Sequence, residues 1–534
     1  MLEHQAWWQD IDAENPTWTV PERFNIAADS LDHHAANAVA ILERGGSRTL
    51  DVTYGELRDR ARRIAGWLLD NGVARGDRVA VFLPQSWELA AVHSAVYYAG
   101  MVAVPLTTKF GDDAVRFRLE NAGVSAIVGR AADLDRIRGG LQGVESLSHV
   151  IAVDEPCTDS TVTLDSVLET PVPDHGLGDT GAEDPALLIY TSGTTGNPKG
   201  ALHAHRVLVG HMPGVRITHD AFPQEGDLFW TPAEWAWIGG LLDVLFPSLA
   251  MGVPVVASDA RVTPELALHM FETVGVRNSF MPPTALKQLR AAGLVPTSSS
   301  VRTIASGGES LGDELQDWVQ QTFGVPVNEF YGQTEMNMTV GQRRQQWTPA
   351  VSSMGRAIPG FEVSVLDPMG EPAEDGTVGE IAVRTPNPGE FLGYWGNPEA
   401  TADKYSGEWL RTGDLGSRTV AGDLKFEGRA DDVISSAGYR IGPGEIEECL
   451  LGHPAVALAA VVGEPDDLRG EMVVGHVVLK DGVVGSAELA EELRLHVKGS
   501  LAFYQYPRRI HFHEELPMTT TGKIQRRLLK GFDG

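Results

Sequence analysis

The spacing of apolar residues in the first part of the chain alternates between two periods. Thr53 and Glu56 fit a capping box, and the apolar residues after them recur at the spacing of one helix face. Short apolar runs typical of buried strands follow at residues 78–83, 102–106 and 124–128, with a helical pattern between each pair. This alternation predicts parallel βαβ units with helices on both faces of a sheet.

The same alternation returns after residue 185 and weakens after about residue 340. Residues 186–190 have the pattern of a buried strand, and Thr263 with Pro264 begins a helical pattern. Between residues 340 and 428, Gly, Pro and Thr separate short β-type runs. Beyond this stretch the pattern is that of a separate small α+β unit.

We therefore predict an α/β protein of two domains. The large N-terminal domain, residues 1–430, would contain two βαβ-type parallel-sheet subdomains and a small β-rich subdomain. Residues 431–534 would form a small α+β C-terminal domain. The length of 534 residues suits this division, because a chain of that size is too long for one hydrophobic core.

Composition and charge narrow the classes of function. The net charge of −29 disfavours a general nucleic-acid or anionic-membrane binder. Cys157 and Cys449 lack metal-ligand spacing and cannot form a disulfide scaffold, which favours a reducing compartment. The acidic amino terminus is unlike a secretory signal, and Asp243, prolines and glycines break the apolar stretch 238–257 into a helix and a strand. We expect a cytoplasmic protein without stable membrane insertion.

The segment Tyr190–Gly200, YTSGTTGNPKG, has the character of a phosphate-binding loop. It follows a predicted strand, at whose carboxyl end α/β sheets bind ligands. Glycines let backbone amides approach an anion, hydroxyls add neutral donors, and Lys199 adds a charge. The candidate residues are Thr191, Ser192, Gly193, Thr194, Thr195, Gly196 and Lys199. A flexible linker is the alternative, whereas the P-loop of nucleoside triphosphatases fails because Lys199 lies between Pro198 and Gly200.

Further clusters follow in order along the chain. They are Ser306–Ser310 (SGGES), Tyr331–Glu335 (YGQTE), Thr412–Asp414 (TGD), Gly428–Arg440 (GRADDVISSAGYR) and Pro517–Lys523 (PMTTTGK). Each alone has a structural explanation, since an aspartate often supports a turn and surface arginines commonly form ion pairs. A lysine near a chain end is equally typical of a solvated basic tail.

Together and in this order, these segments closely resemble the adenylate-forming superfamily of acyl-CoA synthetases, peptide-synthetase adenylation domains and luciferases. The match extends over nearly the whole chain. The resemblance implies an enzyme, an AMP-forming acid–thiol ligase. A carboxylic acid and ATP with Mg²⁺ would give acyl-AMP and pyrophosphate, and a thiol, usually that of coenzyme A, would displace AMP.

The resemblance also implies roles for individual residues. The phosphate-loop residues would hold the β- and γ-phosphates, and the other ATP- or AMP-binding residues would be Gly307, Gly308, Glu309, Tyr331, Gly332, Gln333, Asp414 and Arg429. Thr334 would contact the α-phosphate, Glu335 would hold Mg²⁺, and Lys523 would bridge the acid and the α-phosphate, which makes these three the implied catalytic residues.

In the superfamily the C-terminal domain is mobile and swings between the two half-reactions, so the resemblance places the hinge at Asp431. Gly438, Tyr439 and Arg440 would then face coenzyme A. The alternative for the acidic hinge segment is a solvated turn.

The acid-binding pocket is less clear. By resemblance its residues are Trp235, Trp237, Gly239, Gly240, Ser306 and Gly332. The tryptophans also suit a hydrophobic core. Acetyl-CoA synthetases of the superfamily carry tryptophan at the position of Gly332, so we expect room for an acid larger than acetate. The sequence GYRIGPGEIE at 438–447 resembles the medium-chain branch, which favours a medium-chain or branched acid.

Two alternatives remain at this stage. The acceptor thiol could belong to a separate carrier protein, as in peptide-synthetase loading, or the chain could be a non-catalytic nucleotide-binding protein. Retention of both Lys523 and Glu335 speaks against the second. We expect a small-molecule acid, ATP and coenzyme A as partners, and the sequence leaves the oligomeric state open, a homodimer included.

Overall fold

A computed structural model of the chain describes residues 18–158, 161–173, 176–191, 198–309, 311–436, 439–466, 468–502, 504–518 and 524–531. Contacts divide the chain into two compact units. The first unit comprises Met1–Glu362 and Arg384–Trp409, and the second comprises Val363–Val383 and Leu410–Gly534. The predicted domain boundary at residue 430 stays a prediction.

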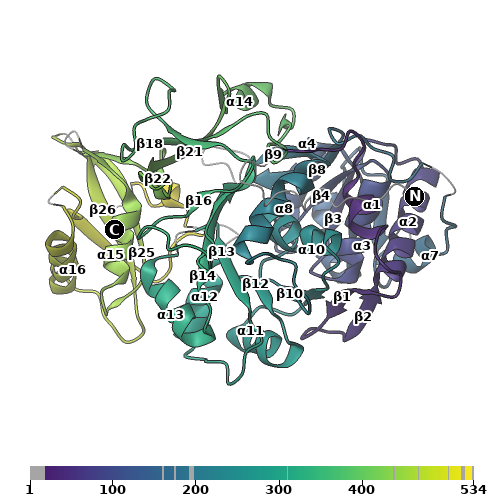
Figure 1. Cartoon of the computed structure of the whole chain (residues 1–534), viewed down its shortest axis with the longest axis horizontal. Helices are drawn as coiled ribbons and strands as arrows, with labels where there is room; N and C mark the ends of the chain where they lie inside the picture. Colours follow the sequence, from purple (N-terminus) through teal and green to yellow (C-terminus); the bar gives the residue numbers. More distant parts are fainter. Residues whose placement is uncertain are drawn as a thin grey trace. The chain divides into compact units, whose positions relative to one another are not determined.

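The first unit contains two sheets (Figure 1). The eight-stranded sheet has the order β19-β9-β8-β4-β3-β5-β6-β7, and six of its strands, β3 to β8, run parallel. Its strands are β3 (Arg78–Phe82), β4 (Val102–Pro105), β5 (Val124–Gly129), β6 (His149–Ala152), β7 (Val162–Thr163), β8 (Pro185–Thr191), β9 (Lys199–Ala204) and β19 (Gly393–Tyr394). At one edge, β9 and then β19 continue the sheet in antiparallel pairing.

The nine-stranded sheet has the order β16-β15-β14-β13-β12-β10-β11-β1-β2. Its strands are β1 (Val39–Glu43), β2 (Leu50–Thr53), β10 (Phe229–Trp230), β11 (Val255–Ala257), β12 (Asn278–Phe280), β13 (Thr303–Gly307), β14 (Val327–Gln333), β15 (Asn337–Gly341) and β16 (Arg356–Ala357). The strands from β14 through β11 to β1 are parallel, and the outer strands are antiparallel.

Helices fill the space between these two sheets and cover their outer faces. The central helices are α1 (Ile26–Leu31), α2 (Tyr54–Asp70), α3 (Trp87–Tyr98), α8 (Val207–Thr218) and α10 (Phe246–Ala250). Their buried residues form one core with side chains of β3, β8 and β11. Helix α3 is buried on every side, as expected for a helix without a polar face.

Separate cores lie on the outer faces of the two sheets. On the eight-stranded sheet the covering helices include α4 (Asp112–Ala122), α5 (Ala131–Arg136) and α6 (Arg138–Leu141). On the nine-stranded sheet they are α11 (Pro264–His269), α12 (Pro283–Ala291) and α13 (Asp313–Phe323), which Figure 1 shows beside β12 to β14. The predicted α/β fold is therefore confirmed.

Two short sequence patterns, the capping box and the apolar stretch 238–257, form the structures that their chemistry predicts. The Thr53 hydroxyl accepts a hydrogen bond from the Glu56 amide, and the Glu56 carboxylate accepts one from the Thr53 amide, which completes the predicted capping box of α2. The apolar stretch 238–257 is broken as expected into α9 (Ile238–Gly240), the π-helical segment η2 (Leu241–Leu245), α10 and β11. Among the described residues, no helix has the length and apolarity needed to cross a membrane.

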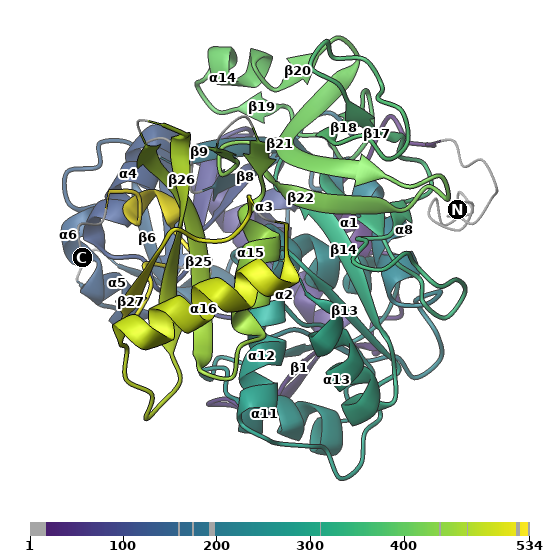
Figure 2. The same ribbon diagram turned by 90° about the vertical axis from the view of Figure 1, so that its left-hand side faces the viewer.

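The second unit contains two small sheets. One includes β17 (Val363–Leu366), β18 (Gly379–Arg384), β21 (Trp409–Arg418) and β22 (Leu424–Arg429). The other is built from β23 (Ile434–Ser436), β24 (Tyr439–Ile441), β25 (Val456–Asp466), β26 (Gly470–Leu479) and β27 (Arg509–His513), with α15 (Pro443–Leu451) and α16 (Ala487–Ser500) packed against it (Figure 2). This small α+β fold agrees with the prediction for the C-terminal domain.

Candidate active site

The predicted phosphate loop connects β8 and β9. The two strands pair antiparallel, so Thr191 lies opposite Lys199 and Tyr190 lies opposite Gly200. The Thr191 hydroxyl donates to the carbonyl of Lys199 over 3.3 Å. Five predicted loop residues, Ser192, Gly193, Thr194, Thr195 and Gly196, lie outside the described residues. The described ends of the segment thus pair as the two strands of a β-hairpin.

Tyr394 links the lysine of this hairpin to the predicted metal-binding carboxylate. Its hydroxyl donates to Oε1 of Glu335 over 2.6 Å, and the Lys199 ammonium lies 5.2 Å from the centre of its ring. Strand β19 places Tyr394 there, because it pairs with β9 and sets Tyr394 opposite Ala201. Residues 199, 335 and 394 are therefore together in the first unit.

Glu335 follows the end of β14, in the tight connection to β15. The Met336 amide donates to the Gln333 carbonyl over 3.2 Å, and Asn337 adopts the left-handed backbone conformation with φ of 64°. Glu335 is buried, whereas Thr334 is partly exposed. A Mg²⁺ ion bound to ATP commonly needs only one or two protein carboxylates besides the phosphates, so a single carboxylate held by a phenol fits that role.

Gly332 is required by the backbone of this hairpin. The pairing of β14 with β15 is irregular between Tyr331 and Gly332, and a Cβ atom on Gly332 would overlap with the carbonyl oxygen of Asn337. The space expected beside this glycine is thus occupied by backbone. The small size of Gly332 therefore does not provide the room for a larger acid that we expected from the sequence. The assignment of Gly332 to the acyl pocket stays a prediction.

The predicted adenine-binding glycines lie at the carboxyl end of β13. Gly307 pairs in parallel with Phe330 of β14, and a Cβ on Gly307 would meet the Phe330 ring at 2.6 Å. Gly308 has a φ of 88°, which favours glycine, and the Glu309 carboxylate accepts a 2.8 Å hydrogen bond from Thr284. Because β13 and β14 end at the same edge, Gly307–Glu309 and Tyr331–Glu335 lie beside each other, as a site at strand ends requires.

The predicted acyl-pocket residues lie in two places in the first unit. Trp235 is fully buried, and its Nε1 has no hydrogen-bond partner among the described residues. Ser306 is also buried, and its hydroxyl likewise has no partner among these residues. Trp237 packs its edge against Phe110, with ring centres 6.2 Å apart. A Cβ on Gly240 would overlap with the Glu234 carbonyl. The carboxylate of Glu234 pairs with Lys109 at 2.7 Å.

In the second unit, Asp414 and Arg429 lie opposite each other on β21 and β22, with Oδ1 and Nη1 3.7 Å apart. The Asp414 residue is buried, and its amide donates to the Thr412 hydroxyl over 3.0 Å. Arg429 Nη2 is also 4.0 Å from Asp431. The predicted ribose-binding and hinge carboxylates are therefore joined through one guanidinium.

The segment after Lys523 is anchored by Arg526. Its guanidinium pairs with Asp432 at 3.0 Å and with Glu447 at 2.8 Å. Burial opposes its charge, but the two carboxylates outweigh burial and raise the pKa of Arg526. Tyr439 stacks on Tyr504 with ring centres 4.2 Å apart. Lys523, Gly438 and the side chain of Arg440 lie outside the described residues.

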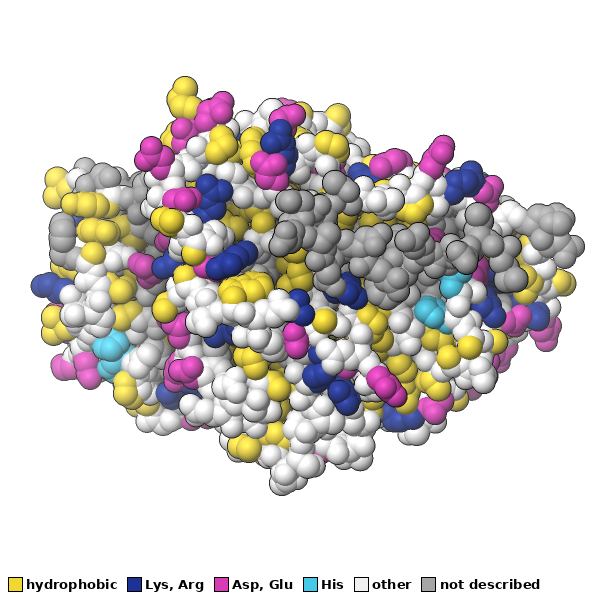
Figure 3. All heavy atoms as spheres, viewed as in Figure 1, with side chains coloured by type: hydrophobic (Ala, Val, Ile, Leu, Met, Phe, Trp, Pro, Cys, Tyr) yellow, Lys and Arg dark blue, Asp and Glu magenta, His cyan; other side chains and the backbone are white. Residues whose placement is uncertain are grey.

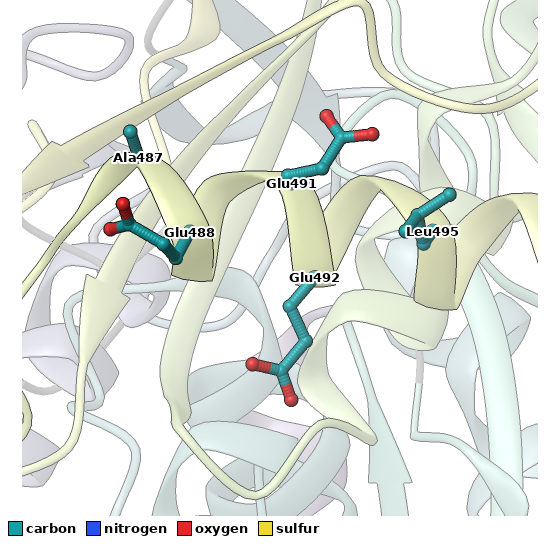
Figure 4. Close-up of a pocket in the computed structure, with 5 residues that line it drawn as sticks. All are labelled: Ala487, Glu488, Glu491, Glu492 and Leu495. Atoms are coloured by element: carbon teal, nitrogen blue, oxygen red, sulfur yellow. The ribbon is translucent and has the colours of Figure 1, made fainter.

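Other surface features carry no predicted role. Acidic and basic side chains are interspersed on the face shown in Figure 3. Helix α16 has a shallow depression lined by Ala487, Glu488, Glu491, Glu492 and Leu495 (Figure 4). None of the residues predicted for the site lies on this helix.

Comparison with known proteins identifies the family. The sequence profile of the family described as AMP-binding enzyme matches residues 27–395, and that of the AMP-binding enzyme C-terminal domain matches residues 445–523. The chain therefore belongs to the AMP-binding enzyme family.

Its relatives are ligases. An acetyl-coenzyme A synthetase from Bacillus subtilis is 32% identical over 523 residues, which cover 96% of this chain and 91% of that protein. The human mitochondrial acyl-coenzyme A synthetase ACSM2B is 33% identical over 538 residues, with coverage of 96% and 91%. The ATP-bound structure of MatB from Rhodopseudomonas palustris is 26% identical, with a TM-score of 0.82 and coverage of 95% and 98%. The protein is thus an enzyme of the acyl-CoA synthetase class, as the sequence indicated.

Sequence reasoning missed Tyr394. Its only signal was an aromatic-rich run, FLGYW at 391–395, in a region otherwise interpreted as small β-rich structure. The predicted roles of the individual site residues stay predictions.

We predict that Gly332→Ala impairs the enzyme with every acid to a similar degree. The added Cβ must displace the backbone of Asn337, which should cost about 1–3 kcal/mol of stability, as overpacking does. Rates of AMP release with short and long acids would measure this, together with thermal unfolding. Gly111→Ala, at a glycine with open space around it, is the control. A selective shift in chain-length preference would contradict the prediction.

We predict that Tyr394→Phe lowers acid-dependent pyrophosphate release roughly tenfold and raises the Mg²⁺ concentration needed for half-maximal rate. The variant loses a hydrogen bond to a buried carboxylate, and such bonds contribute about 1.5–3 kcal/mol, but it keeps the ring beside Lys199. Tyr405→Phe, which removes a hydroxyl from the same part of the chain, should leave both quantities unchanged. Equal behaviour of the two variants would refute the role of Tyr394.

Proposed function

We propose that the protein is an AMP-forming acyl-CoA synthetase that activates a carboxylic acid as acyl-AMP and transfers the acyl group to coenzyme A. The observation that carries the proposal is the Lys199–Tyr394–Glu335 arrangement at the ends of the phosphate-loop hairpin. It brings a cation close to a buried carboxylate that we assign to Mg²⁺, and the cation belongs to a segment rich in glycine and hydroxyl residues, which is the chemistry that a polyphosphate needs.

The first half-reaction brings a carboxylate to an α-phosphate of like charge. In the proposal, the loop and Lys199 would hold the β- and γ-phosphates, and Glu335 would hold Mg²⁺, which would supply positive charge to the phosphates. Thr334 donates to the α-phosphate, and Lys523 lies between the attacking carboxylate and that phosphate. In a site from which water is excluded, each of these charges stabilises the transition state far more than it would in water.

We assign the remaining contacts with the nucleotide to further predicted site residues. Gly307, Gly308 and Glu309 line the adenine, Tyr331 stacks on it beside Gly332 and Gln333, and Asp414 accepts from the ribose with Arg429 next to it. The Asp414–Arg429 pair supports this assignment, because the guanidinium 3.7 Å away holds in place a buried carboxylate whose oxygens can accept from the ribose hydroxyls.

The second half-reaction requires a different arrangement of the C-terminal domain. We assign the hinge to Asp431 and the coenzyme A contacts to Gly438, Tyr439 and Arg440. The exposed face of the Tyr439–Tyr504 stack offers a flat aromatic surface, which suits a pantetheine or adenine group. Cytoplasmic location and a homodimer stay predictions.

For the acid we propose a medium-chain, branched or otherwise bulkier group than acetate. The proposal rests on the likeness to medium-chain synthetases such as ACSM2B. The small size of Gly332 does not support it, because backbone occupies the space beside this glycine. A protein named for acetate is almost as similar, so the identities do not choose between these acids.

The decisive experiment measures AMP release with coenzyme A across acids from acetate to decanoate, plus branched and aromatic acids. Dependence of AMP release on coenzyme A would support the synthetase. Formation of acyl-AMP without transfer to coenzyme A would instead favour the loading of a carrier protein. Absence of any acid-dependent pyrophosphate release would reject both.

We predict that Lys523→Ala reduces acid-dependent pyrophosphate release by at least about a hundredfold, as loss of a charge aimed at the transition state does. Transfer to coenzyme A from supplied acyl-AMP should be largely retained. Lys530→Ala, another lysine of the same C-terminal segment, is the control. If both half-reactions fell equally, Lys523 would not have the assigned role.

A further inference from the structure

A buried histidine–aspartate pair lies next to the predicted acyl-pocket residues and is not used by the proposed mechanism. His211 of α8 and Asp243 of η2 are joined by a 2.7 Å contact between Nδ1 and Oδ1. The His211 side chain is 1% exposed, whereas the Asp243 side chain retains 8% of its surface. Ionisable pairs are rare in apolar surroundings such as the central core of the first unit.

Much of the hydrogen-bonding capacity around this pair is unused. Within the part of the chain that the structure describes, His211 is the one side chain bonded to Asp243, and Nε2 of His211 has no partner. The neighbouring His203 is also fully buried. Buried polar atoms without partners are uncommon and often indicate a missing ligand or water.

The second carboxylate oxygen of Asp243 lies beside Gly239, one of the predicted acyl-pocket residues. A Cβ on Gly239 would lie 3.5 Å from Oδ2 of Asp243 and 2.9 Å from the ring of Phe280. The Phe280 ring packs against Phe330, at 5.2 Å between centres, and Phe330 in turn meets Gly307. The carboxylate therefore lies next to one glycine assigned to ligand binding, and two packed phenylalanine rings connect that glycine to a second one, Gly307.

The local backbone supports a functional role. Asp243 lies in the π-helical turn Leu241–Leu245, which follows the two glycines of α9. Single π-helical turns within longer helices occur frequently at functional sites. Burial raises the pKa of Asp243, and the proximity of His211 does not fully offset this effect. A further hydrogen-bond donor at Oδ2 would stabilise the ionised carboxylate.

We propose that Asp243 recognises a hydrogen-bond donor, a hydroxyl or an amino group, that the acid carries at a distance from its own carboxylate. This inference rests on the proposed acyl-CoA synthetase activity and specifies its substrate class. His211 is then a positioning residue that fixes Oδ1 and leaves Oδ2 for the substrate. An unsubstituted alkyl chain would leave this buried carboxylate without a partner, and such a site discriminates strongly against the analogue that lacks the donor.

Matched acids provide the first test. Hexanoate would be compared with 6-hydroxyhexanoate and 6-aminohexanoate, and benzoate with its hydroxy and amino derivatives, by kcat/KM for AMP release. We expect at least one hydroxy or amino acid to exceed its parent about 10- to 100-fold, and the hydroxy and amino arms identify the donor. Equal or better rates for all the unsubstituted parents would overturn the inference.

Variants provide the second test. Asp243→Leu should lower kcat/KM for the substituted acid and raise it for the parent, thereby reversing the preference, and Asp243→Asn should weaken the preference. Ser248→Ala changes a buried hydroxyl in the nearby helix α10 that has no partner among the described residues, and this variant should preserve the preference. A loss shared equally by all acids would overturn the inference. If Asp243→Leu fails to fold, the asparagine variant and the matched acids decide.

Direct binding separates this inference from the proposed activity. Calorimetry with the wild-type protein would measure the affinity for each matched pair of acids in the presence of a non-hydrolysable ATP analogue. Preferential binding of the substituted acid without AMP release would support the inference while rejecting the synthetase activity. AMP release without any preference for the substituted acids would reject the inference and support the synthetase activity.

Discussion

The hydrogen bond between Tyr394 and Glu335 is the contact on which the described part of the candidate site depends. It joins an edge strand of the eight-stranded sheet to the end of β14 in the nine-stranded sheet. Packed helices fill the space between the two sheets, and further hydrogen bonds, such as those from Gln85 to the carbonyls of Thr231 and Ala233, also join strand ends of the two sheets. The bond from the phenol to the buried carboxylate fixes the positions of residues 394 and 335 relative to each other, because hydrogen bonds are directional whereas apolar packing is not.

The sequence predicted those parts of the fold that depend on residues close together in the chain. The capping box at Thr53 and the strand before the phosphate loop were predicted because each depends on residues a few positions apart. The antiparallel addition of β19 to β9 was not predicted, because it joins residues almost two hundred positions apart, and no local period records such a pairing. Tyr394 was missed for the same reason.

The candidate site shows the same limit. Order and composition of the clusters indicated an ATP-dependent ligase, and the family match agrees. The reason for glycine at position 332 was misjudged, since its environment is set by the carbonyl of Asn337 across the hairpin turn. His211 and Asp243 were not singled out, because only the packing of α8 against η2 brings them together.

The contact between Lys199 and the Tyr394 ring affects how the charges of Lys199 and Glu335 interact. A lysine over the ring of a tyrosine and a glutamate at its hydroxyl could instead pair directly, and each would then neutralise the other. Among the described residues Lys199 has no such ion pair, and its ammonium faces an aromatic ring, an attraction of modest strength. The tyrosine therefore keeps the two charges apart, which the proposed roles of Lys199 at a phosphate and of Glu335 at a metal ion require.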